Sequence, residues 1–89
     1  MSAIREHKIG VVSHWFSRLG VAALDLDEDL HVGDRVHVIG HTTDTFQPVR
    51  SMQIEHHWVN EAHPGDSVAV KMSEHVREHD DVYLVDEEK

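Results

Sequence analysis

Two histidines and a glutamate near the end of the chain have a spacing known from zinc hydrolases. The run His75-Val76-Arg77-Glu78-His79 has the H-x-x-E-H order of inverted zinc proteases. That chemistry needs a helix, because side chains four residues apart on a helix lie about 6 Å from each other and can share one zinc ion. On a strand the same two rings would lie about 13 Å apart. Only Val76 is apolar in this run, so we expect a solvated loop without a metal site.

A second polar run, His41-Thr42-Thr43-Asp44, falls between two predicted strands. Imidazole, hydroxyl and carboxylate groups in one short loop suit a polar pocket at the end of a barrel. The same residues also suit a turn that is capped by the threonine and aspartate oxygens. The sequence leaves both interpretations open.

Trp15 and Phe16 are neighbours in a predicted strand, so their side chains face opposite sides of the sheet. One ring can therefore lie outside, close to Arg18, as a stacking platform for a base or for a partner's side chain. The alternative is that strand ends and loops cover both rings. His56 and His57 are also neighbours in a predicted strand, and on opposite faces they cannot chelate one ion together.

Several classes of catalytic site have no counterpart in the sequence. There is no cysteine nucleophile, no G-x-S-x-G elbow and no phosphate-binding G-x-x-x-x-G-K-[ST] loop. We therefore expect no enzyme activity, no nucleotide hydrolysis and no bound cofactor in this chain.

The charge of the chain is strongly acidic and depends on pH. Among 89 residues, 8 are basic and 17 acidic, which gives a net charge of −9 with neutral histidines. Most of this excess lies in residues 51–89, and such a surface disfavours non-specific binding of phosphate backbones. Protonation of the 10 histidines would reverse the sign, so the surface charge should change steeply around pH 6.5.

The composition also suggests where the protein works. The absence of cysteine fits a reducing compartment. Residues 1–7 lack the apolar stretch of a signal peptide, and no run approaches the roughly eighteen apolar residues that span a bilayer. We expect a cytoplasmic protein without membrane contact.

Short apolar runs separated by turn residues predict strands along the whole chain. The segment around Val36 and Val38 alternates clearly, whereas no window has sustained apolar spacing at three and four residues. Pro48 indicates an edge strand or a bulge. A short helix over residues 60–63 or 74–79 is compatible with the sequence. The expected strands are 8–16, 18–26, 35–40, 46–59, 68–72 and 82–85.

These strands predict an all-β fold, a small closed antiparallel barrel of six to seven strands, because closure is the simplest way to remove exposed sheet edges. The chain should form one domain over residues 1–89, with the barrel over 8–85 and a solvated acidic tail over 86–89. The predicted core consists of Val11, Leu24, Val36, Val38, Ile54, Val68, Val70 and Leu84.

The order of the motifs resembles a known group of domains. Residues 30–36, with the letters LHVGDRV, residues 49–54 and residues 61–70 are similar to the second domain of translational GTPases such as elongation factor Tu. Residues 41–44 and 51–56 make the chain resemble more closely the C-terminal barrel of collagenase-like peptidase-family proteins, some of which are linked to RNA hydroxylation. The resemblance covers about residues 8–85.

The resemblance implies a translation-protein β-barrel and a partner related to RNA. It does not imply GTPase or peptidase activity, which reside in other domains of those families. His79 stands where the family usually has a turn glycine, and the acidic C-terminal half departs from an RNA-binding surface.

We therefore expect a non-catalytic adaptor module that contacts an RNA end or an RNA-associated protein. The alternative is a histidine-dependent metal-binding or pH-sensing protein. The expected binding residues combine loop positions, aromatic rings and the less acidic half of the chain; they are Trp15, Arg18, His41, Thr42, Thr43, Asp44 and Arg50.

Overall fold

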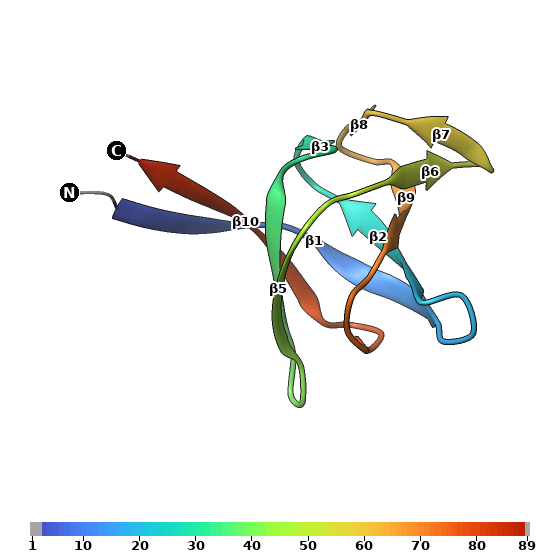
Figure 1. Cartoon of the computed structure of the whole chain (residues 1–89), viewed down its shortest axis with the longest axis horizontal. Helices are drawn as coiled ribbons and strands as arrows, with labels where there is room; N and C mark the ends of the chain where they lie inside the picture. Colours follow the sequence, from blue (N-terminus) through green and yellow to red (C-terminus); the bar gives the residue numbers. More distant parts are fainter. Residues whose placement is uncertain (1–2, 89) are drawn as a thin grey trace.

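The computed structural model describes residues 3–88 and is all-β, as predicted (Figure 1). Neither of the two short helices that the sequence allowed occurs, and no helix within these residues is long and apolar enough to cross a membrane. The ten strands are β1 (Ala3–Phe16), β2 (Val21–Leu26), β3 (Leu30–His31), β4 (Arg35–Ile39), β5 (Asp44–Pro48), β6 (Met52–Ile54), β7 (His57–Val59), β8 (Glu61–Ala62), β9 (Ser67–Lys71) and β10 (Asp81–Glu88).

Eight of these strands form one curved antiparallel sheet in the order β5-β4-β10-β1-β2-β9-β6-β7, and β3 pairs with β8 in a second, two-stranded sheet. Among residues 3–88, no backbone ladder joins the two end strands β5 and β7. The sheet is therefore not closed by backbone pairing, in contrast to the predicted closed barrel.

A buried side chain spans the gap beside β5. The amide nitrogen of Gln47 donates to the carbonyl of Lys71 (2.8 Å), and the amide oxygen of Gln47 accepts from the backbone N–H of Ser73 (2.7 Å). Gln47 is only 3% exposed. Its carboxamide thus replaces, between β5 and the end of β9, the hydrogen bonds that a strand pair would make.

The first and last strands in the chain, β1 and β10, are longer than the sequence predicted. β1 begins at Ala3 rather than at residue 8, and β10 continues to Glu88. Residues 86–88 pair with residues 3–5, so these residues belong to the sheet and do not form the separate tail that the sequence predicted; Lys89 lies outside the described residues. Beyond the last pair with β4, the two strands project from the body as a two-stranded arm (Figure 1). Backbone pairing can order polar residues that carry no apolar pattern.

Two predicted strands are interrupted or shortened by turns. The expected strand over residues 46–59 is instead β5, β6 and β7, because Glu55 and His56 form a two-residue hairpin loop with φ values of 49° and 67°. Met52 and Trp58 therefore do not share one face of a single strand. The segment from residue 17 to residue 20 is a turn, so β2 starts at Val21 and Arg18 lies in the turn.

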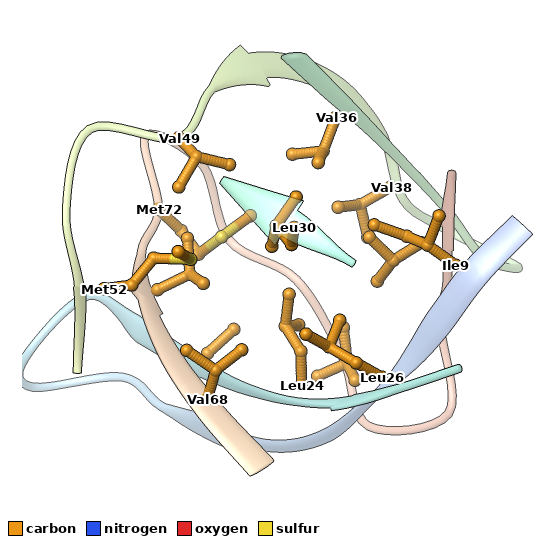
Figure 2. Packing of buried hydrophobic residues seen from close by; sticks show 14 of the residues in the cluster. Ile9, Leu24, Leu26, Leu30, Val36, Val38, Val49, Met52, Val68 and Met72 are labelled. Atoms are coloured by element: carbon orange, nitrogen blue, oxygen red, sulfur yellow. The ribbon is translucent and has the colours of Figure 1, made fainter. Parts of the chain in front are cut away.

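The core fills the space that the curved sheet encloses, with Leu30 of β3 in its middle (Figure 2). Leu24, Val36, Val38, Val68 and Val70 are buried as predicted. Leu84 and Ile54 pack against the core but are only partly buried. Sixteen hydrophobic residues make up the buried cluster, among them Ile9, Val12, Leu26, Val49, Met52, Met72, Val76 and Val82.

The prediction of Val11 as a core residue is wrong by one position, and the reason is local. The register of β1 shifts between Lys8 and Gly10 and again between Val12 and His14. A bulge shifts the alternation of side chains by one residue. Ile9 and Val12 are therefore both fully buried, although they are three residues apart. At the first bulge, a Cβ on Gly10 would clash with the backbone carbonyl oxygen of Asp25.

Candidate functional site

Three connections meet at one end of the sheet: residues 17–20, residues 40–43 and residues 72–80. We refer to these segments, together with residues 14–16 and Asp44, as the loop end. Backbone hydrogen bonds hold the connections together: the N–H of His79 donates to Val12 (2.8 Å), and that of Met72 donates to Gly20 (2.9 Å). Most of the binding residues predicted from the sequence, Trp15, Arg18 and residues 41–44, therefore lie at the same end of the sheet.

Aromatic rings lie along the first side of the loop end. Trp15 packs partly on the core, and its ring lies 5.3 Å from the imidazole of His75. Its indole N–H is buried and has no hydrogen-bond partner among the described residues. On the other side of the strand, Phe16 is 42% exposed and contacts His14 edge to face at 4.3 Å. Phe16, rather than Trp15, is therefore the exposed ring.

The run from His75 to His79 is a loop, as predicted, and not a zinc-binding helix. Arg77 orders it: its Nε donates to the hydroxyl of Thr42 (2.8 Å), and its backbone N–H donates to the carboxylate of Asp80 (2.8 Å). His79 has a φ of 75°, in the left-handed region that favours glycine. Within residues 3–88 no group of three or more histidine, aspartate and glutamate side chains is arranged to hold a metal ion.

The polar run at residues 41–44 divides its side chains between different tasks. Thr43 is mostly buried (6% exposed), Thr42 accepts from Arg77, and the carboxylate of Asp44 binds the ring of His37. Thr42, Thr43 and Asp44 nevertheless line one polar depression of about 350 Å³, together with Thr45, Glu74 and His75. His41 is exposed and lines a neighbouring depression. The structure thus brings three of the four side chains to a polar pocket, and both interpretations of this run stay open.

The two predicted arginines lie at opposite ends of the molecule. Arg18 is exposed in the turn after β1, and within residues 3–88 its guanidinium has no hydrogen-bond or ion-pair partner. Arg50 follows β5, next to the turn at Gly33, whose N–H donates to Val49 (2.8 Å). Six residues of extended chain separate Arg50 from Asp44, about 20 Å. The structure therefore does not unite Arg50 with the other predicted binding residues.

His37 is held by two carboxylates. Its Nδ1 lies 2.6 Å from Glu6, its Nε2 lies 2.5 Å from Asp44, and its ring stacks on Phe46. Burial opposes protonation of the ring, but the hydrogen bonds to Asp44 and Glu6 outweigh it and raise the pKa of His37 above its usual value. The imidazolium form donates to both carboxylates at once, so this clamp favours a protonated histidine.

Some residues of interest were missed in the sequence. His75 and Arg77 were treated as a solvated loop, and nothing in their local pattern placed them beside Trp15 and Thr42. Trp58 fell within the one long strand that was expected over residues 46–59. It is instead 73% exposed on β7, because the hairpin loop at Glu55 and His56 starts a new strand. No sequence pattern of two non-glycine residues announces such a loop.

No protein-family model matches the chain. Among proteins of known sequence, an uncharacterized protease of Methanocaldococcus jannaschii is 41% identical over 87 residues, which cover 97% of this chain and 21% of that protein. A collagenase of Porphyromonas gingivalis is 34% identical over 80 residues, which cover 88% of this chain and 22% of that protein. The chain thus spans about a fifth of the length of these curated relatives.

Among solved structures, two crystal structures of the C-terminal domain of a candidate U32 peptidase from Geobacillus thermoleovorans have the same fold. One has a TM-score of 0.81, with 85% of this chain and 96% of that chain covered, and the other has a TM-score of 0.78, with 92% of both covered. Both are 19% identical, so this likeness concerns the fold. The relatives support the resemblance to C-terminal domains of collagenase-like peptidases, and they do not support the resemblance to translational GTPases.

Proposed function

We propose that this chain is a non-catalytic binding module, a small β-barrel that serves as one domain of a peptidase-like protein, and that its loop end contacts the end of an RNA strand. The relatives support the first part, because the matched region is only about a fifth of an uncharacterized protease and of a collagenase. Any cleavage chemistry of such proteins is then expected outside this region. The bridge made by Gln47 supports barrel closure through a side chain.

The single observation that carries the proposed contact is the grouping of Trp15, Phe16 and Arg18 around one open depression at the loop end. An exposed ring offers a base a stacking surface, and an unpaired guanidinium offers a phosphate one charge. Stacking on one aromatic side chain contributes about 1–3 kcal/mol per base. Two or three such contacts suit a short unpaired end, whereas a duplex needs a longer row of cations.

The charge of the loop end supports binding that depends on pH. It carries two arginines and four acidic residues, a net charge of −2 when its histidines are neutral. Protonation of its four histidines changes this charge to +2. An RNA end should therefore bind better in acid than at neutral pH. The histidines are His14, His41, His75 and His79.

Fluorescence anisotropy of a labelled six-nucleotide RNA, measured at about pH 5.5 and 7.5 and at two salt concentrations, tests this proposal. We expect at least tenfold tighter binding at the lower pH and a shallow dependence on salt. Phe16→Ser and Arg18→Gln should each weaken binding. Arg50→Gln is the matched control, because it removes an exposed arginine at the opposite end of the molecule.

Two results would contradict the RNA proposal. Absence of binding under all four conditions would leave a protein-interaction module as the better account. Equal affinity for a duplex of the same length would show that stacking on an unpaired end is not the basis of recognition.

The His37 clamp favours a second candidate function, pH sensing. Within the part of the chain that the structure describes, four histidines have a carboxylate oxygen within 4.0 Å: His14, His31, His37 and His63. Of these, His37 is buried and joins β1, β4 and β5 through Glu6 and Asp44. Loss of its proton would leave one carboxylate without a donor, which would loosen β1 against β4. A stability that is independent of pH between about 5.5 and 8 would exclude this function.

A further inference from the structure

A shallow apolar trough lies on the outer surface of the sheet, away from the enclosed core. It runs between Trp58 of β7 on one side and Leu19 and Val21 on the other, with Ala69 in its floor, and it has a volume of about 260 Å³. At about 30 Å³ per molecule, this is space for roughly nine waters, or for one large side chain. The short side chain of Ala69 leaves the depression open. In the ladder Ala69 lies opposite Gln53, and Gln53 lies opposite Trp58.

Trp58 does not contribute to the core of the fold. Its side chain is 73% exposed and is not among the residues that pack on the core. On the other wall, Leu19 is 63% exposed. Trp58 and Leu19, on opposite walls of the trough, belong to one continuous exposed apolar surface. In soluble domains such a surface marks a site of interaction. Tryptophan is also enriched among the residues that dominate binding energy at interfaces.

Lys71 is the only charged residue among those that line the trough. Its Nζ donates to the carbonyl of Leu19 (2.6 Å) but has no carboxylate partner within residues 3–88. Arg18, next to Leu19 in the turn, also lacks an acidic partner there. In a chain with a net charge of −9, these two cations beside an apolar trough are complementary to an acidic group on a ligand.

The geometry points to a docking site for an extended segment of a partner protein that carries an aromatic or large aliphatic residue next to a carboxylate. The apolar side chain enters the trough against Trp58, and the carboxylate reaches the ammonium of Lys71. This surface adjoins the proposed RNA contact at Arg18 and Leu19, but Trp58, Ala69 and Lys71 belong to the trough alone.

A peptide fits the trough better than a nucleic acid does. A single ammonium neutralises one phosphate at most, and affinity for RNA without sequence recognition requires several. A lone carboxylate beside one apolar side chain requires only one cation, and the ammonium of Lys71 in the lining of the trough supplies it.

Three probes test this inference by NMR on the ¹⁵N-labelled chain: a nine-residue peptide with a central Glu-Phe-Glu, the same peptide with Lys-Phe-Lys, and hexauridylate. We expect the acidic peptide alone to shift the indole signal of Trp58 and the amide of Ala69. Trp58→Ala should weaken its binding at least tenfold, and Lys71→Gln about two- to fivefold. Ile4→Ala, which removes another exposed apolar side chain (66% exposed), is the control and should leave binding unchanged.

Other outcomes overturn the inference. Shifts at Trp58 with hexauridylate but not with the acidic peptide would make the trough a nucleic-acid site. Equal shifts with both peptides would remove the role of Lys71. Trough signals that move with protein concentration alone would assign the surface to a second copy of this chain, and the absence of any shift would mean that it is not a docking site. Because the trough is tested with Trp58 and Lys71 and the proposed RNA contact with Phe16, failure of one proposal is distinguishable from failure of the other.

Discussion

The imidazole of His37 lies flat on the ring of Phe46, with centroids 3.7 Å apart and planes inclined by 16°. This stack covers one face of the histidine while Glu6 and Asp44 bind its two nitrogens. The ring is thereby fixed in a position where both nitrogens must donate. A charged imidazole also interacts favourably with an aromatic face. The packing of β1, β4 and β5 therefore depends on the protonation state of one side chain, His37.

The pKa of His37 predicts how the free energy of unfolding depends on pH. Burial lowers this pKa, the hydrogen bonds to Asp44 and Glu6 raise it, and the net direction is upward from 6.5. A pKa that is higher in the folded state stabilises the protein fully below the unfolded value, and this contribution is lost as the pH rises through the folded value. Urea unfolding should therefore give a free energy that decreases from about pH 6 to pH 8.5.

His37→Gln should remove most of this pH dependence, because glutamine does not titrate. His7→Gln is the matched control: His7 is an exposed histidine of the same sheet, on β1, and its substitution should leave the pH profile unchanged. If the His37→Gln variant retains the slope of the parent protein, other histidines carry the dependence.

The bridge made by Gln47 predicts that its loss destabilises the whole fold. Gln47→Leu keeps the buried volume but leaves the carbonyl of Lys71 and the N–H of Ser73 without their partners. An unsatisfied buried polar group costs about 1–3 kcal/mol. We expect a decrease of at least that size in the free energy of unfolding, measured by urea titration. Gln53→Leu, which replaces a glutamine for which the structure shows no hydrogen bond, should have a small effect by comparison.

How far the sequence predicted this structure depends on what each residue contacts. Val36, Val38, Val68 and Val70 were placed correctly, because period-two alternation in a short strand is a local property. Residues 86–88 were not, because their strand depends on pairing with residues 3–5 at the other end of the chain. Backbone pairing between such distant segments leaves no local apolar pattern to read.

The candidate site was predicted in part, for a related reason. Trp15, Arg18 and Thr42 do lie at one end of the molecule, since strand ends and turns are visible in the sequence. His75 was not linked to Trp15, and Arg50 was wrongly grouped with the others, because neighbourhood across a curved sheet depends on the order of strands. In the clamp at His37, Glu6 lies 31 positions away in the chain and Asp44 lies 7 positions away, so no local pattern signals it.

Val38 provides a direct test of the core. It is 1% exposed, lies opposite Val82 in the ladder and points into the cluster around Leu30 (Figure 2). Val38→Ala should lower the free energy of unfolding by about 1–3 kcal/mol, through lost burial and the cavity that remains. An unchanged midpoint of urea denaturation would contradict this placement. Val32→Ala is a suitable control, because Val32 is 39% exposed.

The H-x-x-E-H run predicts an outcome for zinc. His75 lies against Trp15, and Glu78 lies 3.5 Å from His14, so two of its three potential ligands have other partners. Isothermal titration with zinc at about pH 7 should detect no stoichiometric submicromolar site, since three or four converging ligands are needed. His75→Ala should behave as the parent protein does. One-to-one binding that disappears in this variant would contradict the prediction.

The hairpin loop between β6 and β7 predicts a stabilising change. Glu55 and His56 both have positive φ, as the central residues of a two-residue type I′ loop require, although neither is glycine or asparagine. A left-handed conformation costs an L-residue other than glycine or asparagine about 1–2 kcal/mol. Replacing the pair by Asn-Gly should therefore raise the free energy of unfolding by about 1 kcal/mol or more, measured by urea titration. The gain should be absent for Asn-Gly at residues 41–42, where the structure has no positive φ. If the loop variant is not more stable, the strain at these two residues is compensated by contacts that the wild-type side chains make. If it is more stable but no longer binds the acidic peptide, the wild-type loop contributes to the position of Trp58.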